Sequence, residues 1–423
     1  MTPDALRPPR LRATTREIPA LDDLLTFAEP HDPMVWTRRG DILVGIGRAA
    51  ALPEGADPGS WWRRVGGAAE VDDEVGQPGT GLVAFGALPF DPAVSTAAAS
   101  LTVPEVVLGR RGGRAWITRI TAEDDDDARA SRGSADLPEP TGFGPHWSAT
   151  VGPGACTPEG YQAAVRDGLA AIASGEVAKV VLARDLVGSA PAGADLRRLV
   201  RALASSYPDT WTFAVDGLIG ASPETLVTVS GGTVTARVLA GTAARGADAD
   251  ADTAASLALA TSAKDLDEHQ YAVQSVLTSL RAHTSALVAE SEPFMLKLPN
   301  VWHLATDVEG TLTGDASALD LLGALHPTAA VAGTPTDAAL SVIRRIERFD
   351  RGRYAGPVGW IDANGDGEWA IALRCAQFDV HGADADGIRL TAHAGAGIVA
   401  GSDPETEMLE TRVKFRPIVD ALA

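Results

Sequence analysis

The sequence has 423 residues, of which 45% are apolar and 22% charged, so we expect a folded protein with a sizeable core. Lys and Arg total 36 against 56 Asp and Glu, and the net charge of −20 excludes nucleic acid and anionic membrane surfaces as expected partners. Two cysteines, Cys156 and Cys375, are too few for a disulfide scaffold, and no stretch is typical of a signal peptide or membrane span. These features predict a cytoplasmic protein, and the charge favours a monomer.

Residues 1–150 are predicted to form a strand-rich part that packs into the same fold as the remainder. Residues 41–47 and 106–110 have the composition of strands, and the Gly-Gly pair after the second strand predicts a hairpin into residues 114–118. An acidic run at residues 123–127 opens a segment rich in Ser, Gly and Pro that extends to about Pro153. We expect this segment to be a solvated linker.

Residues 151–423 are predicted to form the catalytic domain. Thr157 is a good N-cap followed by Pro158, which predicts a helix over 158–174. Further helices are predicted over residues 254–289, 318–325, 336–350 and 404–422. Strands are predicted over residues 177–187, 225–230, 233–239, 356–362, 369–380 and 388–394. Because helices alternate with hairpins instead of single parallel strands, we expect an α+β fold with antiparallel sheets.

Two familiar patterns are rejected as sites. Residues 45–50 match part of a dinucleotide-binding fingerprint, but Pro53 and Pro58 follow where that motif needs a helix. Residues 362–367 open like a calcium-binding loop, but Leu373 stands where a bidentate Glu is required. The second pattern therefore predicts a hairpin turn.

Four carboxylates form two pairs with helical spacing. Asp265 with Glu268, and Glu407 with Glu410, are each three residues apart, so each pair shares one face of a predicted helix. Mg²⁺ is commonly held by one or two carboxylates, and two facing acidic helices would form such a site. The alternative is that both pairs belong to solvated surfaces.

Two further charged residues stand in unusual surroundings. Lys179 lies inside an apolar strand, where the amine either reaches solvent at a strand end or is desolvated toward a useful base. Glu224 lies in the turn before a strand, where it is either an exposed carboxylate or a general acid with a raised pKa.

Many separate motifs, in one order, resemble the chorismate-utilising enzymes, a family that comprises isochorismate, salicylate, anthranilate and aminodeoxychorismate synthases. The resemblance covers residues 157–416, and residues 86–92 also look like the N-terminal part of that family. The matching segments are residues 179–184, 220–224, 239–242, 264–269, 326–333, 353–356, 372–374 and 395–414. The resemblance implies the fold shared by that family, a large β core wrapped by helices, and it implies dependence on Mg²⁺.

The resemblance also implies residue roles. Lys179 matches the base that activates water for attack on C2 of chorismate, and Glu224 matches the acid that protonates the departing C4 hydroxyl. Glu268 and Glu410 match the magnesium ligands, with Asp265 and Glu407 acting through water. The residues that match the substrate pocket are Gly241, Thr242, His303, Ala330, Tyr354, Arg374, Gly395 and Lys414.

Three positions distinguish among family members. Ammonia-using synthases resemble one another in having Gln where this chain has Lys179. The aminodeoxychorismate synthases also have a second lysine at the place where this chain has Leu239-Ala240. Both differences favour water as the nucleophile and predict no glutaminase partner. Salicylate synthases tend to have Thr in place of Ala330, so the expected activity is that of an isochorismate synthase feeding menaquinone or siderophore synthesis.

Three alternatives remain open at this point. The enzyme could continue to salicylate and pyruvate, or could be an ammonia-using synthase. A third alternative is an inactive scaffold that binds cations or metabolites, against which the presence of the matching base, acid and metal residues argues.

Overall fold

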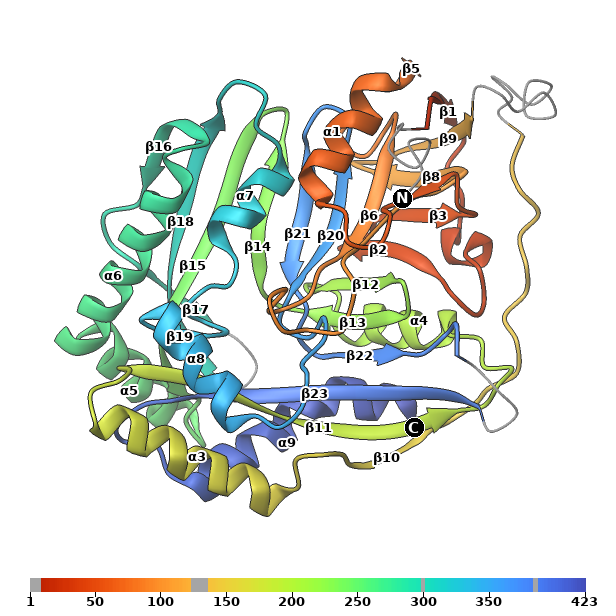
Figure 1. Ribbon diagram of the computed structural model, residues 1–423. Helices are drawn as coiled ribbons and strands as arrows, with labels where there is room; N and C mark the ends of the chain where they lie inside the picture. Colours follow the sequence, from red (N-terminus) through yellow and green to blue (C-terminus); the bar gives the residue numbers. More distant parts are fainter. Residues whose placement is uncertain (1–8, 123–135, 298–300, 383–386) are drawn as a thin grey trace.

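Two large β-sheets form the centre of the computed structural model, which describes residues 9–122, 136–297, 301–382 and 387–423 (Figure 1). Both sheets combine strands from before and after residue 150, and the domain boundary there stays a prediction. The first sheet has 13 strands, which in spatial order are β10 (Thr150–Pro153), β11 (Lys179–Ala190), β23 (Ile388–Ile398), β22 (Cys375–Phe378), β13 (Leu218–Ser222), β12 (Trp211–Val215), β2 (Met34–Arg38), β3 (Asp41–Ile46), β8 (Val106–Arg111), β9 (Arg114–Ala122), β1 (Leu11–Ile18) and β5 (Glu70–Asp73), with β19 (Gly333–Thr334) paired to β11.

The second sheet has 10 strands and shares the core with the first. Its spatial order is β16 (Thr284–Ala289), β18 (Val301–Leu312), β15 (Thr233–Ala244), β14 (Thr225–Ser230), β21 (Gly367–Ile371), β20 (Pro357–Asp362), β6 (Val83–Ala87), β7 (Ser100–Val103) and β4 (Ala50–Ala51), with β17 (Phe294–Lys297) paired to β18. The strand pairs of the described residues are antiparallel except β1 with β5. The expected α+β fold with mostly antiparallel sheets is therefore confirmed.

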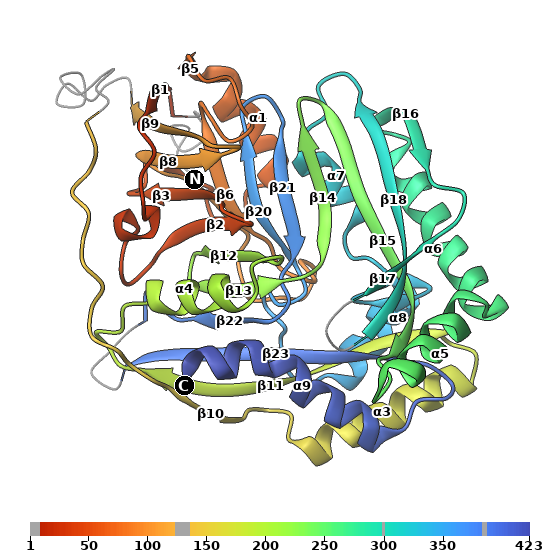
Figure 2. The same ribbon diagram turned by 180° about the vertical axis from the view of Figure 1, so that it is seen from behind.

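Helices cover the outer sides of both sheets. They are η2 (Leu24–Phe27), α1 (Pro58–Ala68), α3 (Pro158–Ala173), α4 (Arg197–Ser206), α5 (Ala249–Ala260), α6 (Ala263–Leu280), α7 (Ala318–Leu325), α8 (Thr336–Ile346) and α9 (Pro404–Leu422). Figures 1 and 2 show α5 and α6 beside β15 and β18, and α3 and α9 beside β11 and β23. The two helices that carry the acidic pairs, α6 and α9, therefore pack against different sheets.

Two apolar cores account for this arrangement. The larger core contains aromatic side chains of both sheets, including Trp36 and Phe213 from the first sheet and Phe85 and Trp369 from the second. The smaller core packs α4 and α9 against the other face of the first sheet, with Phe415 of α9 among its buried residues. Burial of these large side chains stabilises the stacking of the sheets.

Several predicted elements are confirmed where the local signals are strong. The side chain of Thr157 accepts a hydrogen bond from the Gly160 N–H, and α3 begins at Pro158 as expected. Helices α7 and α9 have the predicted bounds, and β14 and β15 form the predicted hairpin. Residues 362–367 form the predicted hairpin turn between β20 and β21.

One predicted helix is wrong. Residues 254–289 form the end of α5, the whole of α6 and then strand β16. The side chain of Ser262 accepts a hydrogen bond from the Asp265 N–H and starts a new helix after Thr261 ends the previous one. The strand that follows pairs with β18, a long-range contact that helical periodicity does not reveal.

Two other predictions need correction. The strand expected over residues 369–380 is two strands in different sheets, β21 and β22, because the chain turns at Arg374, whose φ is +52°. The expected linker ends in strand β10, which pairs with β11, while its acidic run at residues 123–127 lies outside the described residues. The turn between β21 and β22 places Arg374 where the chain passes from the second sheet to the first.

Candidate functional site

Lys179 is the first residue of β11, and its side chain passes over β23. A Cβ atom added to Gly397 would lie 3.0 Å from Lys179 Cε, so the absence of a side chain at Gly397 makes room for the lysine. The neighbouring Val180 and Leu182 point to the opposite, buried face of the strand. Strand alternation therefore directs the amine away from the larger core, toward a partly exposed surface.

Glu224 lies between β13 and β14 with its backbone fixed by hydrogen bonds. Its N–H donates to Ser222 Oγ at 3.2 Å, and its carbonyl accepts from the Ile371 N–H at 3.0 Å. The residue keeps partial exposure, but burial is the largest influence on its carboxyl and raises its pKa. This placement favours the protonated form that a general acid needs.

Three cations surround the Glu224 carboxyl. Lys179, Lys414 and Arg374 each act on it in the direction that lowers its pKa, although burial outweighs them. These three side chains come from β11, α9 and the turn between β21 and β22, which are far apart in the sequence. The fold therefore gathers positive charge around one buried acid in a protein whose net charge is −20.

Lys414 is fixed at the edge of this group. Its Nζ donates to the Gly395 carbonyl at 2.8 Å and forms an ion pair with Glu410 Oε1 at 2.5 Å. The lysine and the glutamate are four residues apart on α9, so one helical face presents both charges. This contact also links α9 to β23, the strand that lies beneath Lys179.

Arg374 and Tyr354 interact with each other next to Glu224. Burial lowers the pKa of the Arg374 guanidinium, which interacts with Tyr354, Glu410 and Glu224. Burial also raises the pKa of the Tyr354 hydroxyl, and the ring stacks on His393 with centroids 5.2 Å apart. A neutral phenol beside an arginine is a suitable pair of donors for a carboxylate.

The remaining predicted pocket residues lie on β15, β18 and the segment before β19. Gly241 forms a β-bulge in β15 with a φ of +77°, which favours glycine, and Thr242 is paired with His303. Burial lowers the pKa of His303, which also interacts with Lys414 and Lys179. Ala330 is partly exposed near β19, and β19 pairs with β11 at Lys179. The side chain of Thr242 lies outside what the structure describes.

The acidic residues occupy α6 and α9 as expected. Burial is the largest influence raising the pKa of Glu407, and the nearby Glu410 raises it further. Two carboxylates that repel each other in this way suit a divalent cation with oxygen ligands. Asp265 is partly exposed in the first turn of α6, close to Gly241, whereas the side chain of Glu268 is not among those described.

His269 fixes the position of α6. Its Nδ1 donates to the Ala240 carbonyl at 3.1 Å, which leaves Nε2 to accept from Thr306 Oγ1 at 2.8 Å. Burial lowers the pKa of this histidine, so the neutral ring is favoured. The acidic face of α6 is therefore tied to the β15 bulge at Gly241 and to strand β18.

Sequence reasoning missed Glu347 and Arg351, which form a buried ion pair next to the site. Each side chain is 3% exposed, and the pair contacts β11 and the segment that contains Ala330. A spacing of four residues is common in exposed helical ion pairs, so the sequence carried no sign of burial.

The sequence did carry a signal for Lys179 and Lys414, namely the rarity of lysine, because the chain has only four lysines among 36 basic residues.

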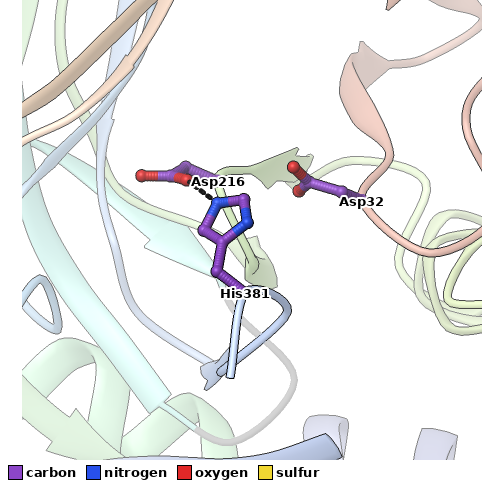
Figure 3. A group of neighbouring side chains, drawn as sticks. All are labelled: Asp32, Asp216 and His381. Carbon is purple, nitrogen blue, oxygen red and sulfur yellow. Dashed lines mark hydrogen bonds and ion pairs between the residues drawn. The ribbon is translucent and has the colours of Figure 1, made fainter. Parts of the chain in front are cut away.

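A second group of potential metal ligands lies elsewhere. Figure 3 shows Asp32, Asp216 and His381, whose ligand atoms lie within 4.8 Å of one another. Asp216 already pairs with Arg353 at 2.8 Å and with His381 at 3.3 Å, so its charge is compensated by protein groups. None of these residues belongs to the group that the sequence predicted.

Two open pockets also lie away from the predicted residues. One, of about 200 Å³, is lined by Trp36, Trp211, Glu368 and several arginines, and the other, of about 250 Å³, lies beside α4. Within the described parts of the chain, helices long and apolar enough to span a membrane are absent.

Comparison with known proteins gives consistent results. The family model described as "Chorismate binding enzyme" matches residues 5–423. The chain is 42% identical over 277 residues to the isochorismate synthase DhbC of Bacillus subtilis, covering 63% of this chain and 68% of that protein. It is 40% identical over 356 residues to the putative isochorismate synthase MenF of Mycobacterium tuberculosis, covering 81% and 87%.

A solved structure extends the similarity to nearly the whole chain. The crystal structure of a putative 2,3-dihydroxybenzoate-specific isochorismate synthase from Bacillus anthracis superposes with a TM-score of 0.71 at 30% identity. The match covers 94% of this chain and 98% of that one, and so includes both sheets.

Proposed function

Because this chain belongs to the chorismate-binding enzyme family, we propose that it is an isochorismate synthase, an isomerase that converts chorismate to isochorismate. The relatives named as isochorismate synthases support this assignment. So does Lys179, which stands where the ammonia-using members of the family resemble one another in having glutamine.

The observation that carries the proposal is the group of charges around Glu224. A carboxyl whose pKa is raised by burial interacts electrostatically with two lysines and one arginine. Chorismate carries two carboxylates, so an acidic protein needs local cations to bind it. The same group offers a titratable amine and a protonated acid, the two functions that exchange of one hydroxyl for another requires.

In the proposed reaction, the Lys179 amine removes a proton from water as the water oxygen bonds to C2 of chorismate. The ring double bond shifts, the C4–O bond breaks, and Glu224 donates a proton to the departing hydroxyl. One water enters and one leaves, so the reaction is an isomerisation without a redox change. Proton transfer from the protonated amine back to the carboxylate restores both residues.

We propose that one set of residues holds the enolpyruvyl carboxylate and that a second set lies beside the ring and its carboxylate. Arg374, Tyr354, Lys414 and the Gly395 backbone would hold the enolpyruvyl carboxylate. Gly241, Thr242, His303 and Ala330 would lie beside the ring. This division leaves Lys179 and Glu224 free to act on the ring carbons.

We propose that the acidic residues of α6 and α9 would hold a Mg²⁺ ion. Burial and the nearby Glu410 both raise the pKa of Glu407, and a cation would relieve the repulsion between the two carboxylates; Glu410 also interacts electrostatically with Arg374 and His303. Glu268 and Glu410 would bind the ion, with Asp265 and Glu407 reaching it through water. When bound, the ion would neutralise the ring carboxylate.

The test is an incubation of the purified protein with chorismate and Mg²⁺, with and without ammonium, followed by identification of the products by chromatography and mass spectrometry. We expect isochorismate in both incubations, and loss of product when a chelator removes the metal. Salicylate with pyruvate would instead indicate a salicylate synthase, and an aminated ring would indicate an ammonia-using synthase. Binding of chorismate without any product would contradict the assignment as an enzyme.

A further inference from the structure

A buried ion pair lies behind the residues proposed to act on chorismate. Arg351 Nε donates to Glu347 Oε2 at 2.8 Å, and Arg351 Nη2 donates to Glu347 Oε1 at 2.6 Å. Both side chains are 3% exposed, and the guanidinium lies over the Phe90 ring, 4.3 Å from its centroid. Such a bidentate pair is rigid, because both partners are fixed in direction as well as in distance.

The pair holds strand β11 just beyond Lys179. Arg351 Nη2 donates to the Val181 carbonyl at 2.7 Å, and Glu347 Oε1 accepts from the Ala183 N–H at 2.7 Å. Val181 shares a strand face with Lys179. The β11 backbone is therefore fixed at Val181 and Ala183, two and four residues after Lys179.

Arg351 also holds two other parts of the proposed site, one through its guanidinium and one through its backbone carbonyl. Arg351 Nη1 donates to the Val331 carbonyl at 3.0 Å, directly after Ala330. The Arg351 carbonyl accepts from the Tyr354 N–H at 3.0 Å. One residue thus connects the strand of the proposed base, the segment beside the ring and the tyrosine of the carboxylate pocket.

We propose that Glu347 and Arg351 are positioning residues, which hold Lys179, Ala330 and Tyr354 in the arrangement that the reaction needs. The proposal rests on the proposed function for the meaning of that arrangement. Neither residue is proposed to touch chorismate. Their role is to fix the position and direction of the Lys179 amine. Proton transfer depends on this geometry, because a misplacement of about 1 Å is enough to slow a reaction.

The main variants are Arg351→Lys and Glu347→Gln. Lysine keeps the charge but loses the planar fork that reaches two carbonyls and a carboxylate at once. Glutamine keeps the shape and one acceptor but removes the charge that compensates the arginine. We expect kcat to fall by about tenfold to a hundredfold and KM to change by less than about threefold.

A matched control separates positioning from a general loss of packing. Arg197 and Asp195 form another bidentate pair, with side chains 0% and 3% exposed. The guanidinium of Arg197 donates to carbonyls outside the proposed site, those of Thr26, Ala28, Thr141 and Gly142. Arg197→Lys and Asp195→Asn should lower Tm to a similar extent and leave kcat unchanged below that temperature.

A second readout does not depend on the reaction. The chain has four lysines, Lys179, Lys264, Lys297 and Lys414, so carbon-13 reductive methylation gives few NMR signals, and Lys179→Ala assigns the one of interest. In the Arg351 and Glu347 variants we expect the chemical shift of the Lys179 signal to change at a fixed pH, because the amine takes a different position relative to the charged groups around Glu224.

The outcomes are distinct. A wild-type kcat together with a wild-type Lys179 chemical shift in both variants would overturn the proposal, as would equal losses of kcat in the Arg197 and Asp195 controls. If the variants do not fold, Phe90→Leu, which removes only the ring beneath the guanidinium, decides by the same two measurements. A wild-type protein that forms no isochorismate would defeat the proposed function, while the NMR comparison would still judge the positioning.

Discussion

At the scale of single residues, the choice between lysine and arginine is informative. The chain has 36 basic residues but only four lysines, and Lys179 and Lys414 both act on Glu224. Arginine stays protonated in proteins, whereas lysine can lose its proton when it is desolvated or placed near other cations. A lysine at position 179 is therefore a chemical requirement if the residue is a base, and arginine would serve as well if only charge mattered.

The first prediction follows for Lys179 and Glu224. Lys179→Ala and Glu224→Gln should each lower kcat by about 10²- to 10⁴-fold, because each removes one proton transfer. Binding of chorismate in the presence of Mg²⁺, measured by calorimetry, should remain. Lys297→Ala is the matched control, because that lysine is 56% exposed and pairs with Asp252. A near-normal rate in either main variant would remove that residue from the mechanism.

At the scale of elements, the register of β11 and β23 determines the space around the proposed base. Gly397 is paired with Val181, and the Lys179 side chain crosses the strand at this glycine. A Cβ atom there would lie 3.0 Å from Lys179 Cε and 3.7 Å from its Nζ, closer than ordinary contact for the carbon. The glycine is therefore part of the path of the lysine side chain.

Gly397→Ala should displace the Lys179 amine and lower kcat, with little change in the free energy of unfolding, because a flexible side chain can move away from the new methyl group. Steady-state kinetics and chemical denaturation measure the two effects separately. Gly401→Ala is the control, because a Cβ added there would meet nothing within 4 Å. Equal kcat values for the two alanine variants would show that the approach of Lys179 to β23 has no functional importance.

At the scale of the whole molecule, burial of neutral histidines connects the core to pH. His393 lies in β23, stacked between Phe349 and Tyr354, and burial lowers its pKa to about 4. The unfolded chain has the ordinary value of about 6.5, so between these two values the unfolded state binds more protons than the folded state. The contribution of His393 to stability therefore rises with pH across this window and is lost as pH falls through it.

His393→Phe keeps the stacking and removes the titration. We expect the free energy of unfolding of the wild-type protein to fall by about 3 kcal/mol more than that of the variant between pH 6.5 and pH 4. Urea denaturation at a series of pH values measures this difference. His146→Phe, at an exposed position, should keep the wild-type pH dependence. Parallel pH profiles for wild type and His393→Phe would contradict the assignment of a neutral, buried histidine.

Local signals in the sequence were sufficient for part of the fold. Helices α3 and α9 begin with an N-cap followed by proline, and the β14–β15 hairpin turns at two glycines, so neighbouring residues determine these elements. The prediction failed between residues 254 and 289, where a serine cap divides the helix and pairing with β18 forms a strand. Pairing partners far away in the chain decide such cases, and periodicity does not contain them.

The sequence by itself determined the family, the α+β class and the candidate residues, because these depend on residue identity and order. Only the tertiary structure decided that Lys179, Glu224, Arg374 and Lys414 converge, that burial dominates the pKa of Glu224, and that Glu347 and Arg351 are enclosed. The physical reason is that burial and electrostatic interaction are sums over surrounding atoms. In this protein those atoms belong to strands and helices that are distant in sequence and are brought together only when the two sheets stack.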